Sequence, residues 1–158
     1  MAFDPGLHTG IAIWDDKGKF IKWHTTHSNE ELHAYLAEDV EGIKVVIYED
    51  YRLFRHKAQE QVGSKIPAAQ AIGIIETFAR IWKAKIIKQP SSIKSTAEKW
   101  TGLVTAGMSH DKTHPIDAFN HGEYYMIKLG LKEIKIRGIN EARDEAKKIR
   151  RTRRRTTD

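Results

Sequence analysis

The chain begins with a stretch that decides the fold, Phe3-Asp4-Pro5-Gly6-Leu7-His8-Thr9-Gly10-Ile11-Ala12-Ile13-Trp14. An apolar strand ends at Asp4, and Pro5 and Gly6 then supply the backbone angles of a tight turn. The apolar residues after Gly10 predict a second strand that returns beside the first. Gly10 itself allows the backbone to pass close to a ligand. The stretch therefore predicts a carboxylate at the mouth of a sheet, although Asp-Pro-Gly alone is more typical of a plain turn.

Length and composition restrict the class of protein. The 158 residues suffice for one core with helices on a sheet. The absence of cysteine excludes a disulfide framework and a zinc-thiolate site. The apolar runs are too short to span a bilayer, and the N-terminus lacks the sections of a signal peptide. We therefore expect a soluble, cytoplasmic protein.

Basic charge is concentrated at the C-terminal end. Residues 132–158 hold eleven of the 27 basic and five of the 21 acidic residues, which accounts for the whole net charge of +6. We therefore divide the chain into a balanced domain at 1–131 and a basic tail at 132–158, helical or disordered. Such a tail favours a polyanionic partner such as nucleic acid, and a solubilising tail is the alternative. The tail residues that we expect to contact DNA are Arg150, Arg151, Arg153, Arg154 and Arg155.

Hydrophobic periodicity predicts the element order β-β-β-α-β-α-β-α-α. Strands are expected at 2–3, 10–14, 20–25, 44–49 and 86–88, with a hairpin turn at 15–18. Helices are expected at 28–38, at 66–85, from 90 onward, and from 113 to about 128. The first of these helices begins at a capping box formed by Ser28 and Glu31. The pattern predicts an α/β domain.

Acidic residues follow two predicted strands and recur on the last helix. Glu49 ends a strand at the carboxyl edge, where open α/β sheets bind ligands. If the first and fourth strands are neighbours, Asp4 and Glu49 approach within the span of one or two metal ions. His114, Asp117 and His121 share a helix face about 60° wide. That face alone is typical of solvated surface, but its combination with two strand-end acids indicates a site.

Four segments occur in an order that resembles the RuvC-like Holliday junction resolvases of the RNase H-like superfamily. They are Asp4-Pro5-Gly6 with Gly10, the strand-ending Glu49, Gln89-Pro90-Ser91-Ser92-Ile93-Lys94, and His114-Pro115-Ile116-Asp117-Ala118. The resemblance covers residues 3 to about 129. It implies an RNase H-like mixed sheet flanked by helices, and an active-site lysine at Lys94. The metal-binding residues that it implies are Asp4, Glu49, His114 and Asp117.

This chain departs from the pattern of the family in two places, and these differences indicate which members it resembles more. Only Met1 and Ala2 precede Phe3, so we expect a shorter first strand than in the family. The segment between Gly102 and Asp117 is also shorter than in bacterial resolvases. The chain is therefore more similar to the compact resolvases of bacteriophages.

The resemblance implies a metal-dependent endonuclease that resolves four-way or other branched DNA by paired nicking as a homodimer. In the family the long helix, here 66–85, supplies much of the dimer contact. Two Mg²⁺ ions about 3.5–4 Å apart would activate water and stabilise the leaving oxygen. Mn²⁺ is the other candidate. Many family members have aspartate where this chain has His114, and a histidine ligand favours Mn²⁺ more than a carboxylate does. His114 as a general base or acid is the alternative. We expect no small-molecule cofactor and no membrane partner.

Aromatic and basic residues after Glu49 suit phosphates and unstacked bases. The residues of this kind that we expect to contact DNA are Tyr51, Arg52, Phe54, Arg55 and Lys57. The resemblance implies that Tyr51 or Phe54 wedges into the junction centre, and spacing does not choose between them. Packing of both rings onto the domain is the alternative. Lys112 is a weaker candidate than Lys94 for contact with the scissile phosphate.

Two other classes of function remain as alternatives. A nucleotide-binding protein of the actin or sugar-kinase type shares the strand and turn pattern, but such proteins use two domains of this size. A non-catalytic DNA-binding module is disfavoured by the presence of Asp4, Glu49 and Asp117. The six histidines other than His114 and His121 show no metal-ligand spacing.

Overall fold

Five strands and four α-helices make up the described part of the chain in our computed structural model, which covers residues 1–38, 42–50, 66–105, 108 and 110–132, with the backbone alone at 110–112. The strands are β1 (Ala2–Asp4), β2 (Thr9–Trp14), β3 (Phe20–Thr26), β4 (Val45–Glu49) and β5 (Lys85–Gln89). The helices are α1 (Asn29–Ala37), α3 (Pro67–Ile81), the 3-10 turn η2 (Ser91–Ile93), α4 (Lys94–Thr101) and α5 (His110–Lys128). The predicted element order is confirmed within these residues.

The strands form one mixed sheet in the order β3-β2-β1-β4-β5. Strand β2 pairs antiparallel with β1 and β3, whereas β1, β4 and β5 run parallel. The carboxyl ends of these three parallel strands therefore lie at one edge of the sheet, together with the start of β2 and the end of β3. The predicted adjacency of the first and fourth strands is confirmed.

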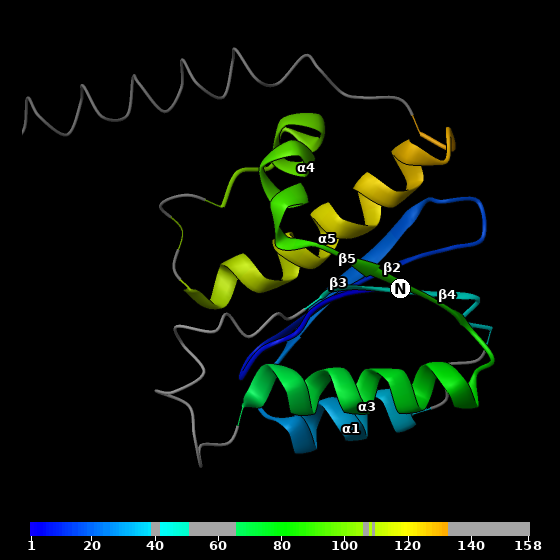
Figure 1. The fold of residues 1–158 in the computed structure, drawn as a ribbon, viewed down its shortest axis with the longest axis vertical. Helices are drawn as coiled ribbons and strands as arrows, with labels where there is room; N and C mark the ends of the chain where they lie inside the picture. The colour runs from blue at the N-terminus through cyan, green and yellow to red at the C-terminus, as the bar shows by residue number, and fades with distance from the viewer. Residues whose placement is uncertain (39–41, 51–65, 106–107, 109, 133–158) are drawn as a thin grey trace, which may run out of the picture.

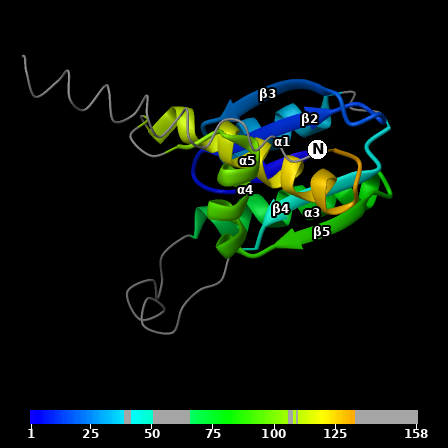
Figure 2. The ribbon, with the colours of Figure 1, turned by 90° about the horizontal axis from the view of Figure 1, so that it is seen from above.

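Helices cover both faces of the sheet (Figure 1). Helices α1 and α3 lie on one face, and α4 and α5 lie on the other. Seen from above, α5 crosses over the middle of the sheet (Figure 2), where it contacts β1 and β2. The helix that carries the predicted metal ligands therefore covers the strand that carries Asp4.

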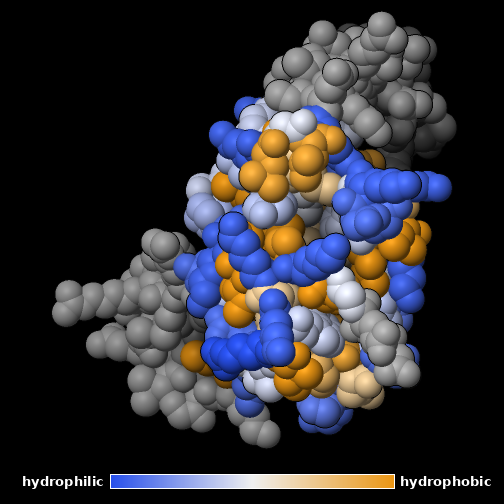
Figure 3. All heavy atoms as spheres, turned by 90° about the vertical axis from the view of Figure 1, so that its right-hand side faces the viewer, coloured by the Kyte–Doolittle hydropathy of each residue, from blue (hydrophilic) through white to orange (hydrophobic). Residues whose placement is uncertain are grey.

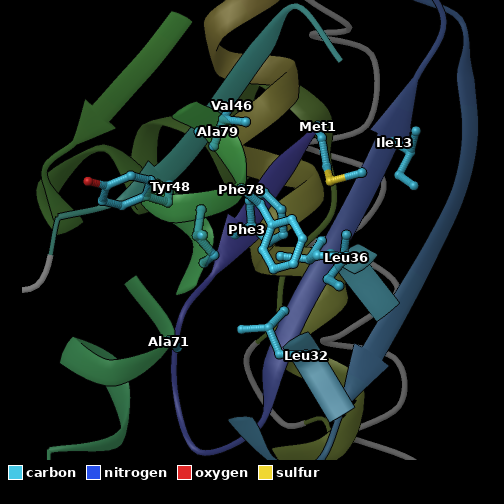
Figure 4. Packing of buried hydrophobic residues seen from close by; sticks show 12 residues of the cluster. Met1, Phe3, Ile13, Leu32, Leu36, Val46, Tyr48, Ala71, Phe78 and Ala79 are labelled. Atoms are coloured by element: carbon cyan, nitrogen blue, oxygen red, sulfur yellow. The ribbon is translucent and has the colours of Figure 1, made fainter. Parts of the chain in front are cut away.

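The main apolar core lies between the sheet and helices α1 and α3. Figure 4 shows Phe3, Tyr48 and Phe78 within this cluster of buried residues. Because successive side chains of a strand point to opposite faces, burial of Phe3 and Tyr48 on this side directs Asp4 and Glu49 toward the opposite face. The apolar pattern of β1 and β4 thus orients both acids toward α5.

The predicted hairpin turn and the first helix are confirmed. Gly18 donates its N–H to the Asp15 carbonyl at 3.1 Å. At the start of α1, Ser28 Oγ accepts a hydrogen bond from the Glu31 N–H at 3.1 Å. The Glu31 carboxylate accepts from the His27 N–H at 2.7 Å, one residue before the position that the capping box predicts.

The prediction of a helix over 66–85 is wrong at its C-terminal end. Helix α3 ends at Ile81, and Lys83 has a left-handed φ of 55°. The N–H of Ala84 then bonds the Ala79 carbonyl at 2.8 Å, which closes the helix end. Trp82 packs against the core beyond the end of the helix. The apolar period continues through this residue, so periodicity alone does not reveal the end.

Exposed apolar side chains are scattered over the described part of the surface. The large ones are Leu7, Ile21, Trp23, Ile81, Val104, Met108, Leu129 and Leu131. Figure 3 shows one face of the molecule, on which hydrophobic and hydrophilic groups are interspersed. Among the described helices, none is long and apolar enough to cross a membrane.

Candidate active site

Two glycines allow α5 to lie close to β2. A Cβ added to Gly10 would lie 2.0 Å from the carbonyl oxygen of His114, so strand and helix backbones are in contact there. A Cβ added to Gly122 would lie 2.2 Å from the ring of Trp14, whose Nε1–H donates to Glu123 at 2.8 Å. These contacts fix the position of α5 over the sheet. The close approach predicted at Gly10 is to this helix and not to a ligand.

Asp4 and His114 form the first of three acid–nitrogen pairs at the carboxyl edge. Asp4 Oδ2 lies 2.6 Å from His114 Nδ1, and each side chain is 15% exposed. The hydrogen bond to Asp4 raises the pKa of His114, and the negative charge of Asp117 acts in the same direction, against the effect of burial. His114 therefore retains a proton to higher pH than a free histidine does.

Asp117 and Lys94 form the second pair, with 2.5 Å between Asp117 Oδ2 and Lys94 Nζ. Asp117 is 5% exposed, and burial raises its pKa although the hydrogen bond from Lys94 opposes this. Burial lowers the pKa of Lys94, but the bond and the charge of Asp117 raise it by more. Asp117 Oδ1 is buried and has no hydrogen-bond partner in the described residues. A buried acceptor without a partner is costly, and a cation or a proton donor would satisfy it.

Glu49 and His121 form the third pair, with 3.3 Å between Glu49 Oε2 and His121 Nε2. His121 is 1% exposed, and its Nδ1 lies 2.7 Å from Gln89 Oε1. The helix face that carries Asp117 and His121 is therefore buried against the sheet, so the alternative of a solvated face is wrong for these two residues. Helical spacing predicts His121 on that face, but His121 is not among the predicted site residues.

The oxygen and nitrogen donors at this edge are of types that bind divalent cations. Carboxylate oxygens suit Mg²⁺, and an imidazole ligand also suits Mn²⁺. The buried Asp117 Oδ1 is an acceptor that such an ion would satisfy. Within the part of the chain that the structure describes, however, no three His, Asp or Glu side chains surround a common point. The ligand types fit a cation, but in this arrangement Asp4, Glu49 and Asp117 are each occupied by a nitrogen partner instead.

Other predicted site residues lie partly or wholly outside the described residues. The side chain of Lys112 is not described, although its backbone belongs to α5. The other predicted DNA contacts lie wholly outside the described residues. They are Tyr51, Arg52, Phe54, Arg55, Lys57, Arg150, Arg151, Arg153, Arg154 and Arg155. They stay predictions.

Two histidines that contact each other lie beside the site. His8 Nδ1 and His27 Nδ1 are 3.2 Å apart, and the His8 and His114 rings lie 6.2 Å apart between centroids. Their separation along the chain gave no signal of this contact, which arises because β2 begins and β3 ends at the same edge.

The strand order and the two helical layers define an RNase H-like fold. Among solved structures, Thermus thermophilus RuvC in complex with a Holliday junction substrate is similar, with a TM-score of 0.56 and 13% identity over 84% of this chain and 96% of that chain. A second Thermus thermophilus RuvC structure gives a TM-score of 0.52 and 14% identity, with the same coverage. No family model and no curated protein matches the sequence. The RNase H-like fold predicted from the sequence is confirmed, in the form found in RuvC.

Proposed function

We propose that this protein is a metal-dependent endonuclease that resolves four-way or other branched DNA junctions. The observation that carries the proposal is the location of Asp4, Glu49 and Asp117 at one edge of a RuvC-type sheet. Asp4 and Glu49 end neighbouring parallel strands, and Asp117 on α5 has a buried oxygen for which the described residues supply no hydrogen-bond partner. One of the similar structures contains Holliday junction DNA, which supports branched DNA as the substrate class.

The proposed roles of these residues are supported by the chemistry of their side chains. A divalent cation held by Asp4, Glu49, His114 and Asp117 would make a bound water nucleophilic and stabilise charge on the phosphate oxygens. Lys94 compensates the charge of Asp117, and its side chain is 40% exposed, so its ammonium group can also reach a phosphate. His114 must give up its proton before Nδ1 can act as a ligand.

The oligomeric state and the outer DNA contacts are further parts of the proposal. A homodimer would place two such sites to nick two strands of a two-fold symmetric junction. The predicted aromatic and basic residues at 51–57 and in the tail would bind the junction outside the catalytic edge.

Cleavage assays test the proposal. A labelled four-way junction, a linear duplex of the same sequence and ATP are each incubated with Mg²⁺, Mn²⁺ or EDTA. We expect paired nicks in the junction with either metal, and no cutting of the duplex or in EDTA. Hydrolysis or tight binding of ATP without nicking would instead favour a nucleotide-binding protein, and junction binding without nicking would favour a DNA-binding module.

A further inference from the structure

Two histidines from neighbouring strands face each other beside the candidate active site. Thr9 of β2 and Thr26 of β3 are register partners in an antiparallel pair. His8 and His27 therefore lie opposite each other, one residue beyond this pair. Their Nδ1 atoms are 3.2 Å apart, whereas the centroids of the two rings are 5.2 Å apart. Both nitrogens thus point into the space between the rings.

Local hydrogen bonds hold the backbone on both sides of this contact. In the turn that carries His8, the N–H of Gly6 donates to Thr9 Oγ1 at 3.4 Å, and this hydroxyl lies 3.3 Å from the Gly6 carbonyl oxygen. On the other side, the N–H of His27 donates to Glu31 Oε2 at 2.7 Å. The two residues are therefore placed opposite each other by the fold, and mainly their side-chain torsions remain free to adjust.

The chemistry of two facing Nδ1 atoms suits a shared cation. In a neutral imidazole one ring nitrogen donates and the other accepts, so a direct hydrogen bond requires a proton on only one of these two Nδ1 atoms. If both rings carry their proton on Nε2, two lone pairs face each other, and a cation between them replaces this repulsion by two bonds. Two Zn–N bonds of about 2.0–2.1 Å at a tetrahedral angle place their nitrogens about 3.3 Å apart, close to the 3.2 Å between His8 and His27.

We propose that His8 and His27 bind a divalent ion that prefers imidazole ligands, represented by Zn²⁺, at a site separate from the carboxylates of the catalytic edge. Imidazole nitrogen suits Zn²⁺, whereas Mg²⁺ prefers oxygen ligands. Among the described residues no third His, Asp or Glu side chain completes such a group. His8 is half-buried and His27 is exposed, so water supplies the remaining ligands. The ion links the turn between β1 and β2 to the residue that precedes the N-cap of α1.

Substitution of His27 by asparagine separates a metal site from a hydrogen-bonded pair. The amide of His27→Asn can still hydrogen-bond to His8, but Zn²⁺ in proteins is bound by Cys, His, Asp and Glu and not by an amide. His33→Asn, an exposed histidine of α1, is the matched control. Titration calorimetry of the metal-free full chain with Zn²⁺ alone should show one site that His27→Asn weakens roughly 100-fold and His33→Asn leaves unchanged. Loss of a group that only orients a metal ligand already costs about 10- to 100-fold in affinity.

Two further measurements locate the ion and detect its effect on the fold. Long-range ¹H–¹⁵N spectra of the wild-type protein should show that Zn²⁺ shifts the Nδ1 resonances of both His8 and His27. Because an ion that binds only the folded state stabilises it, Zn²⁺ should also raise the Tm of the wild type and of His33→Asn by more than that of His27→Asn. The spectra use the wild-type protein, so they test the site even if a variant loses its fold.

Two outcomes overturn this site. Zn²⁺ binding that the wild type and a folded His27→Asn protein share with equal affinity and stoichiometry is adventitious or belongs to the carboxylates. Spectra in which Zn²⁺ leaves the Nδ1 resonances of His8 and His27 unchanged lead to the same conclusion. None of these measurements involves DNA, so the inference and the proposed nuclease function stand or fail separately.

Discussion

At the scale of single residues, the candidate site consists of acids that already have nitrogen partners. Asp4 contacts His114, and Asp117 contacts Lys94. A cation that binds Asp4 and uses His114 Nδ1 must replace the proton on that nitrogen, whereas it can reach Asp117 through Oδ1, which Lys94 does not contact. Metal binding is therefore coupled to proton release, as is usual where a ligand must first be deprotonated.

The pKa of His114 predicts how stability depends on pH in the metal-free protein. Folding raises this pKa through the bond to Asp4, so the protonated ring stabilises the folded state. This contribution is fully present below the unfolded-state pKa of about 6.5 and is lost as pH rises through the raised folded-state value. We expect the free energy of unfolding of the wild type to exceed that of His114→Gln most at acidic pH. Urea unfolding in EDTA across this pH range measures the difference, and a difference that grows with pH would contradict the assignment.

At the scale of elements, the site depends on how closely α5 lies on β2. Gly10 is in contact with the backbone of α5 at His114 and Pro115. Backbone atoms cannot move aside as a flexible side chain can, so any added Cβ must push the helix away. The same displacement would separate His114 from Asp4.

Gly10→Ala should therefore reduce stability and activity together. Over-packing of this kind costs about 1–3 kcal/mol, and a displacement of helix α5 by an ångström can lower the rate about 100-fold if α5 carries the proposed site. Urea unfolding and junction cleavage measure the two effects. Gly73→Ala in α3 is the control, because a Cβ there meets nothing within 4 Å. Alanine favours a helix, so this control should be about 0.5–1 kcal/mol more stable. A Gly10→Ala protein with native stability would show that the contact is not tight.

The sequence predicted the parts of the site that depend on local pattern. Asp4 and Glu49 each end an apolar strand, and alternation along the strand places both on the face opposite the main core. The spacing of His114, Asp117 and His121 predicted one helix face. Lys94 was predicted from the resemblance alone, and the structure places it against Asp117.

What the sequence did not predict depends on contacts between elements. The polar face of α5 is more typical of solvated surface. The sequence pattern of an amphipathic helix does not show that the polar edge of a sheet packs against that face. The contact of His121 with Glu49 and Gln89 joins three elements and has no signature in spacing. The end of α3 was missed since Trp82 continues the apolar period beyond the last helical turn.

At the scale of the whole molecule, basic charge is concentrated in the C-terminal segment that we predict to be a tail. The segment 138–158 holds eight basic and four acidic residues, and its structure lies outside the described range. A segment with net positive charge and few large apolar residues suits contact with the DNA backbone, whatever the shape of the DNA.

Deletion of residues 138–158 should weaken binding to junction and duplex by similar factors. Each phosphate contact that is lost should reduce the slope of log affinity against log salt by about 0.9. Cleavage at saturating enzyme should persist, because the acids lie in the domain. Binding isotherms at several salt concentrations measure this. If the deletion removes selectivity for the junction over the duplex at fixed salt, the tail recognises branched structure.

The most direct test of the central claim is the rate at which Glu49→Gln cuts a labelled four-way junction. The substitution keeps the size of the side chain and removes the negative charge that a cation requires. Asp4→Asn is its companion at the neighbouring strand, and Asp16→Asn in the exposed hairpin turn is the control. We predict that both site variants, folded by circular dichroism, bind the junction with nearly native affinity and do not cut it. A well-folded Glu49→Gln protein that cuts at close to the wild-type rate would contradict the account.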